Sequence, residues 1–241
     1  MEQSVYKCML NDFPLEDISL DNPQGLQGGA YISKLNLNDE SVVIQTPKCF
    51  TKNGIVRTDK KMYCDLIFDA NDDDVIEFFD AIEDKIKSLI YEKKDTWFHS
   101  EMDMDTIDYH WNNMLRAYKS SKLLLRCNIK KPSRSKVDIE PVIEVYNEDE
   151  SVATLNDIVK DIPLMGLITL SGLKFTTQSF SIEIYIDQVM ILKNRIADKG
   201  CLIKIDRPLK PTVEVSSSGT TLDTTLDTTL DTTLDTTLDA T

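Results

Sequence analysis

The sequence has little of the material on which catalytic and metal sites are usually built. It contains two histidines, His99 and His110, and five cysteines that never occur as a C-x-x-C pair. A Ser–His–Asp triad, a His-rich metal site and a structural zinc site are therefore poorly supported. The chain also lacks a glycine-rich phosphate loop and the G-x-S-x-G and H-E-x-x-H motifs. We expect no catalysis, no metal and no cofactor.

Signals for export and for membrane insertion are also missing. The first residues lack the basic region and the apolar region of a secretory signal. The most apolar stretch, residues 162–173, is about 12 residues long, whereas a membrane-spanning helix needs about 20. An odd number of cysteines without paired spacing favours a reducing compartment. These absences predict an intracellular protein with no membrane partner.

The two ends of the chain differ in composition from its middle. Thr-Thr-Leu-Asp occurs five times in succession between Thr220 and Asp239. Threonine is a poor helix former and isolated helices of this length are marginal, so we predict a disordered, mildly acidic tail over residues 216–241. Such a repeat can arise by copying slippage, and this origin accounts for the repeat as well as a functional role would. Residues 1–30 are punctuated by proline and glycine and are predicted to be irregular, which leaves residues 31–215 as a single domain.

Hydrophobic periodicity predicts strands, then two helices, then further strands. Strands are expected over residues 41–46 and 62–68, with Asn53-Gly54 as a turn signal between them. A helix is expected over residues 71–94, with aspartates at its start and an apolar stripe, and a second over about 105–119. Later strands are expected over 122–129, 140–146, 152–155, 164–174, 179–191 and 201–205, with a bulge at Gln188-Val189. This order predicts an α+β domain with a curved antiparallel sheet or partial barrel and two inserted helices.

Charge is segregated along the chain. The whole sequence has a formal net charge of −14, yet the residues between Tyr109 and Val137 include eight basic and no acidic side chains. Alternation along the strand at 122–130 places Lys122, Arg126 and Lys130 on the face opposite its core residues. Cations would then recur every ~13 Å, which suits a phosphodiester backbone. Glu183 and Asp187 are expected on the opposite side of the sheet.

Two basic stretches and two aromatic residues make up the candidate nucleic-acid site. The first stretch comprises Lys119, Lys122, Arg126, Lys130, Lys131, Arg134 and Lys136, the second comprises Lys48, Lys52, Arg57, Lys60 and Lys61, and Trp111 and Tyr118 are the candidate base-stacking residues. An alternative is that these cations form solvated faces that balance the acidic helix at residues 72–84. Trp111 has its own alternative as a core residue, because it shares a helix face with Ile107 and Leu115.

An acidic cluster after the first helix is the best candidate for a metal site. It comprises Glu101, Asp103, Asp105 and Asp108, whose carboxylates suit Mg²⁺ or Ca²⁺. The cluster lies where a helix needs an N-cap, and capping explains it more simply. An enzyme that uses these carboxylates is therefore the last of our hypotheses.

Two segments of the second half carry a family resemblance. They are the basic strand SKLLLRCNIKK at residues 121–131 and the hairpin GLITLSGLKFTTQSFSIEIYIDQVMIL at residues 166–192. Together they resemble the OB-fold single-stranded DNA-binding proteins of large double-stranded DNA viruses, in which such a hairpin closes the barrel and an acidic tail follows. The resemblance implies an OB-like partial barrel.

The same resemblance implies a function and a setting. The protein would bind single-stranded DNA without catalysis and with little sequence preference, with replication proteins as further partners. It would act in the host cytoplasm or virus factory, or be packaged in the virion. The alternative function is that of a viral structural or scaffold protein acting through protein–protein contacts. The sequence leaves the oligomeric state open.

Overall fold

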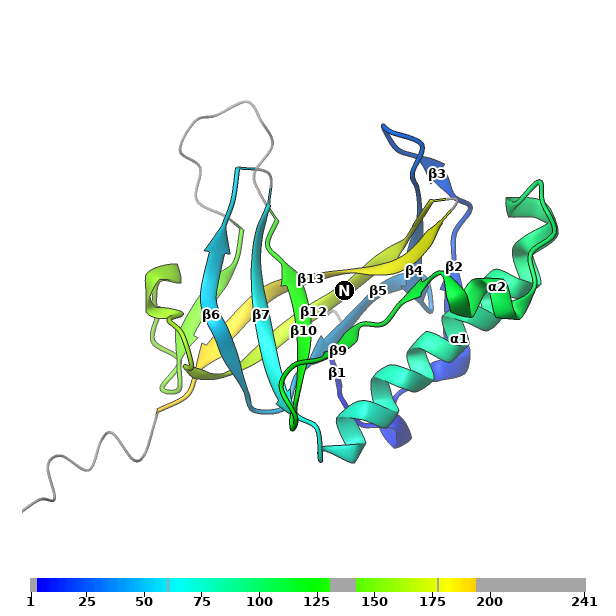
Figure 1. Ribbon diagram of the computed structural model, residues 1–241. Helices are drawn as coiled ribbons and strands as arrows, with labels where there is room; N and C mark the ends of the chain where they lie inside the picture. Colours follow the sequence, from blue (N-terminus) through cyan, green and yellow to red (C-terminus); the bar gives the residue numbers. More distant parts are fainter. Residues whose placement is uncertain (1–3, 60, 131–141, 177, 194–241) are drawn as a thin grey trace, which may run out of the picture. The chain divides into compact units, whose positions relative to one another are not determined.

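The computed structural model describes residues 4–59, 61–130, 142–176 and 178–193 (Figure 1). They belong to the first of two units into which the chain divides, residues 1–200. The second unit, residues 201–241, lies outside the described residues, and with it the expected strand at 201–205 and the repeat tail. The described chain is mostly β-sheet with few helices. In this part of the chain no helix is long and apolar enough to cross a membrane.

Five strands form a closed ring of hydrogen-bonded neighbours. They are β6 (Cys49–Arg57), β7 (Met62–Asp69), β10 (Lys122–Asn128), β12 (Pro163–Thr176) and β13 (Ser179–Ile191). The ring runs β6-β7-β10-β13-β12 and returns to β6, with the β10–β13 pair parallel and the other four antiparallel. Two of these pairings are short: β10 pairs with β13 at one residue position, and β12 pairs with β6 at two. Figure 1 shows β6, β7 and β10 side by side and the long β12–β13 hairpin running across the molecule.

The strands of the hairpin follow from alternation in the sequence. Apolar residues two positions apart are buried over most of β12 and β13, such as Ile168 and Leu170 or Ile184 and Ile186, which confirms the strands expected at 164–174 and 179–191. The predicted bulge occurs one residue early. The register leaves the backbone position of Asp187 unpaired with β12, because Gln188 pairs with Leu167 and Ile186 with Ile168.

The N-terminal residues add short elements to this ring. These are β1 (Tyr6–Lys7), β2 (Ile18–Leu20), β3 (Gln24–Gly25), β4 (Tyr31–Leu37) and β5 (Glu40–Gln45), with 3₁₀ turns η1 (Leu10–Asp12) and η2 (Leu15–Asp17). β12 extends past the ring and pairs with β4 and β5. Although we expected residues 1–30 to be irregular, Phe13, Ile18 and Leu20 are buried in the core. The segment is therefore packed against the domain over much of its length.

Two helices lie between β7 and β10 in the chain, as expected. α1 (Asp73–Trp97) begins where the Asp72 carboxylate accepts a hydrogen bond from the Val75 N–H at 3.4 Å, and its apolar stripe is buried. α2 (Met104–Tyr109) is much shorter than the predicted helix at 105–119. The prediction of a helix beyond Tyr109 is wrong, because the chain there forms β8 (Trp111–Asn112) and β9 (Leu115–Ala117), which pair with β13 and β10.

Two further local predictions are corrected by the structure. Asn53-Gly54 lies inside β6, and the hairpin turn comes later, where the Thr58 N–H donates to the Lys61 carbonyl at 2.8 Å. The strand expected at 152–155 is reduced to a single bridge between Val152 and Tyr146, followed by η3 (Leu155–Asp157). β11 (Glu144–Asn147) corresponds to the end of the strand expected at 140–146 and pairs in parallel with β13.

Candidate nucleic-acid interface

The outer face of the ring is formed by side chains that point away from its interior. Alternation in β10 turns Leu125 and Cys127 into the core, where both are 0% exposed, and turns Lys122 and Arg126 outward as predicted. Residues directly opposite each other on neighbouring strands share a face. The register therefore brings Tyr63, Asp65 and Ile67 of β7 to the outer face beside Asn128, Arg126 and Leu124 of β10.

Each of the three cations of the predicted row, Lys122 and Arg126 on β10 and Lys130 just after it, has a carboxylate partner. The pairs are Lys122 Nζ with Asp69 Oδ2 at 3.0 Å, Arg126 Nε with Asp65 Oδ1 at 2.7 Å, and Lys130 Nζ with Asp187 Oδ1 at 2.8 Å. The partners come from β7 and β13. The alternative in which the acidic helix at residues 72–84 balances these cations is therefore wrong for this row. Asp187 also lies on the same side as Lys130 and not on the opposite side of the sheet.

The three pairs differ in how firmly they are held. Asp65 is 3% exposed and also accepts a second bond from Arg126, from Nη2 to Oδ2 at 3.0 Å. Removing Arg126 would leave the buried Asp65 carboxylate with an uncompensated charge, which is costly away from water. Both Lys122 and Lys130 instead have half-exposed side chains paired with partly exposed carboxylates, and such pairs contribute little in water. A phosphate can displace the two lysines from their partners more readily than it can displace Arg126.

The remaining described cations of the candidate site carry no such partner. Within the described ranges, no carboxylate lies within ion-pair distance of Lys48, Lys52, Arg57, Lys61 or Lys119. These five side chains are free to neutralise an anionic ligand at no cost in broken ion pairs.

Tyr118 joins the two basic stretches. The Lys52 ammonium from β6 lies 4.4 Å from the centre of the Tyr118 ring, and the Lys119 ammonium lies 5.3 Å from it. Residues that are far apart in the sequence therefore meet at one half-buried ring. Phe50, which sequence reasoning missed, lies on the same outer face opposite Ile67 and is 42% exposed.

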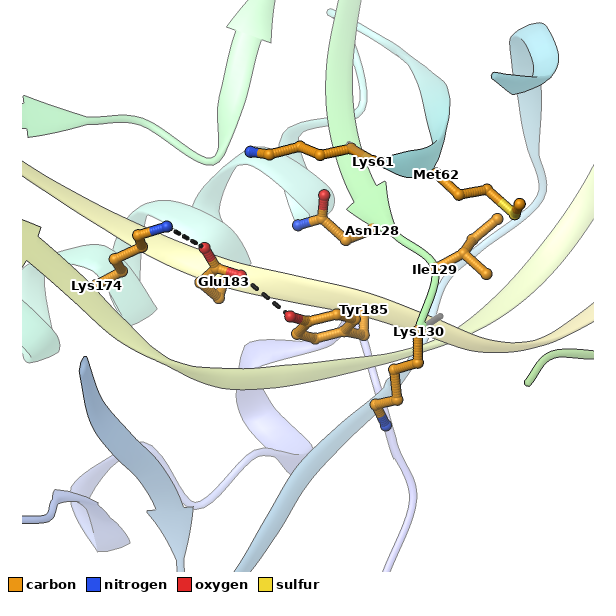
Figure 2. Close-up of a pocket in the computed structure, with 8 residues that line it drawn as sticks. All are labelled: Lys61, Met62, Asn128, Ile129, Lys130, Lys174, Glu183 and Tyr185. Carbon is orange, nitrogen blue, oxygen red and sulfur yellow. Dashed lines mark hydrogen bonds and ion pairs between the residues drawn. The ribbon is translucent and has the colours of Figure 1, made fainter. Parts of the chain in front are cut away.

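A pocket of about 350 Å³ opens beside the end of β10 (Figure 2). Its lining residues are Lys61, Met62, Asn128, Ile129, Lys130, Lys174, Glu183 and Tyr185. Figure 2 shows Glu183 between Lys174 and Tyr185, with an ion pair to the first at 3.3 Å and a hydrogen bond from the second at 3.2 Å. Burial and the neighbouring Glu183 raise the pKa of Tyr185, so the phenol keeps its proton and donates. The pocket combines three ammonium groups, an amide and a ring.

Several residues of this surface were not predicted from the sequence, and one predicted stacking residue lies in the core instead. Tyr63, Lys174 and Tyr185 were missed, although Tyr185 stands between the apolar Ile184 and Ile186 and is thereby assigned to the polar face. Trp111 is a core residue, 8% exposed, and its Nε1 donates to the Glu83 carboxylate at 2.6 Å. Its ring cannot stack on a base without leaving the core. The predicted Lys60, Lys131, Arg134 and Lys136 lie outside the described residues.

The acidic cluster after α1 has structural uses. The Asp103 carboxylate caps α2 by accepting from the Thr106 N–H at 2.8 Å, and hydrogen bonds with the Thr106 side chain and backbone lower the pKa of Asp103. Asp108 pairs with Lys87 at 2.9 Å. The capping interpretation of Asp103 is confirmed. Across residues 4–59, 61–130, 142–176 and 178–193, no three His, Cys, Asp or Glu side chains are grouped so that they could hold a metal ion.

The chain has distant structural similarity to phage proteins. No family model matches it, and no curated protein matches it. It is similar to the solved structure of gp2.5, a single-stranded DNA-binding protein of bacteriophage T7, with a TM-score of 0.39 and 10% identity over 63% of this chain and 91% of that chain.

A second phage protein, the single-stranded DNA-binding protein of bacteriophage Enc34, is similar in two structures. A C-terminally truncated form gives a TM-score of 0.40 and 9% identity over 73% of this chain and 94% of that one. Its complex with single-stranded DNA gives 0.39 and 8% over 73% and 96%. Likenesses this distant do not transfer a function, so we infer the function of this chain from its own outer face.

Proposed function

We propose that this chain is a non-catalytic single-stranded DNA-binding protein and that its closed ring of strands is an OB-like barrel. An OB-fold is a five-stranded barrel that binds oligonucleotides over its second and third strands and over the loops that follow its first and fourth strands. In this ring the corresponding parts are β7, β10, the β6–β7 turn and the β12–β13 turn. The pocket of Figure 2 takes residues from β7, β10, β12 and β13, and Lys61 from the β6–β7 turn.

One observation carries this proposal: cations without a carboxylate partner among the described residues share the outer face with one exposed and two half-buried aromatic rings. Lys52, Lys61 and Lys119 are available to backbone phosphates, since each lacks a carboxylate partner among the residues described. Phe50, Tyr63 and Tyr118 supply rings on which bases stack. Phosphate contacts and stacking carry little base information, so binding is nearly indifferent to sequence.

The decisive experiment replaces these three free lysines together. The Lys52→Gln, Lys61→Gln, Lys119→Gln variant should bind oligo-dT more than tenfold more weakly than the parent chain, as measured by fluorescence anisotropy. The slope of log affinity against log salt should flatten by roughly 0.7 for each lost phosphate contact. Lys94→Gln on α1 is the matched control and should change neither quantity. Absence of salt-sensitive binding by the parent chain refutes the proposal and favours the alternative of a viral structural or scaffold protein.

The finer setting of this function is also a proposal. The basic strand at residues 121–131 and the hairpin at 166–192 resemble those of single-stranded DNA-binding proteins from large DNA viruses. On that basis we place the protein with replication proteins in the host cytoplasm or virus factory. A pull-down of tagged protein from infected cells, with and without nuclease, tests whether replication proteins associate directly or only through DNA.

A further inference from the structure

The guanidinium of Arg126 occupies a different environment from the lysines around it. Its Nε and Nη2 donate to the two oxygens of Asp65 at 2.7 and 3.0 Å, and its Cζ lies 4.1 Å from the centre of the Tyr63 ring. Asp65 is 3% exposed, whereas the Arg126 side chain is 44% exposed. One edge of the guanidinium is therefore fixed by a carboxylate and one side contacts a ring, while nearly half of the Arg126 side chain is exposed.

We propose that Arg126 binds a nucleobase by stacking rather than a phosphate by charge, and that Asp65 is the positioning residue that holds the guanidinium for this task. The inference rests on the proposed function and assigns a base subsite within it. It replaces the phosphate contact that the sequence pattern predicts for Arg126.

Competition from Asp65 is the first reason. A phosphate that took the Nε and Nη2 hydrogens would leave a buried carboxylate without its bidentate partner, with only Arg116 Nη2 remaining, 4.0 Å from Oδ1. Asp65 also balances the charge of Arg126, so the pair has little net charge with which to neutralise a phosphate and release counterions from the DNA. Lys122 and Lys130 are also paired, but their carboxylate partners Asp69 and Asp187 are partly exposed and easily solvated after release.

The planar shape of the group is the second reason. Unstacked bases are bound on guanidinium planes as well as on aromatic rings, and the delocalised charge attracts their π-faces. The ring of Tyr63 supports the guanidinium from one side, and hydrogen bonds to both Asp65 oxygens restrict its rotation. A base that stacks on the remaining exposed side leaves every one of these contacts in place.

Two probes of equal length separate stacking from charge. Oligo-dT carries phosphates and bases, whereas an oligomer of abasic tetrahydrofuran units carries the phosphates alone. Arg126→Gln and Arg126→Lys are compared with the parent chain on both probes across a range of salt concentrations. Asp65→Asn, Arg126→Gln is measured alongside them, because it removes the carboxylate charge that Arg126→Gln alone would leave buried and unpaired. Lys52→Gln is the phosphate-contact control.

For Arg126→Gln and Arg126→Lys alike, we expect binding to oligo-dT to weaken by at least about fivefold, with the salt slope and the affinity for the abasic oligomer unchanged. Lys52→Gln should weaken binding to both probes and flatten the slope. The inference is overturned if Arg126→Lys restores parental affinity, if Arg126→Gln weakens binding to both probes equally with a flatter slope, or if neither variant changes binding. A parent chain that binds neither oligomer removes the proposed function itself, which is a distinct outcome.

Discussion

At the scale of single residues, the same side-chain type has different roles depending on what lies opposite it. Trp111 and Tyr118 are both aromatic residues upstream of the basic strand, and both were candidates for stacking. The structure buries Trp111 against Glu83, whose pKa is raised by burial although the Trp111 and Met114 N–H groups donate to it. Tyr118 instead lies half-buried between two lysines. Sequence alone does not separate these roles, because the difference depends on partners from distant strands and from α1.

The Trp111→Phe variant tests the assignment of this ring to the core. Phenylalanine preserves most of the apolar contact but removes the Nε1 donor, which leaves one oxygen of the buried Glu83 carboxylate without its partner. We expect the free energy of unfolding, measured by urea denaturation, to fall by about 1–3 kcal/mol. Affinity for oligo-dT should stay within twofold of the parent. A large loss of affinity in a variant of normal stability would return Trp111 to the binding site.

At the scale of elements, periodicity within a segment predicted the longest elements, and the pairing of strands that are far apart in the chain was not predicted. α1, β12 and β13 follow directly from apolar residues at helical or alternating spacing. The pairing of Arg126 with Asp65 depends on the register between β7 and β10, which are separated by two helices in the chain. No local pattern encodes that register. The sequence therefore identified the outward face of β10 but not the carboxylates that share it.

Gly54 shows how a turn signal can serve another purpose. Its φ is +66°, and a Cβ added there would lie 2.3 Å from the Ile158 carbonyl oxygen, so glycine permits the bulge of β6 and the close approach of the loop before β12. Gly54→Ala should lower the free energy of unfolding by about 1–3 kcal/mol. Gly28→Ala is the matched control, since Gly28 also has a positive φ, +87°, but open space around it. Thermal or urea denaturation of both variants separates the cost of a positive φ from the cost of the clash with the Ile158 carbonyl. An equal loss of stability in both variants would contradict a steric role for Gly54.

At the scale of the whole molecule, net charge gives little guidance to the proposed binding surface. The chain carries −14 overall, yet its outer face combines unpaired lysines with cations whose carboxylates are supplied by neighbouring strands. Short-range geometry dominates here, because salt screens charges separated by more than about 8 Å at physiological ionic strength. Counting basic residues along the sequence led to this outer face, but the count includes three cations that are paired with carboxylates.

Removal of residues 216–241 tests how the domain is bounded. The segment contributes five aspartates and no basic residue, so its deletion changes the formal net charge from −14 to −9. Its leucines recur every fourth residue among threonines, a composition that gives no broad apolar face for burial, and we expect the melting temperature to change by no more than about 2 °C. A variant in which all five repeat leucines are replaced by serine retains the length and charge and should behave like the parent. If deletion and the leucine variant both lower the melting temperature by several degrees, the repeat packs on the domain and the boundary at residue 215 is wrong.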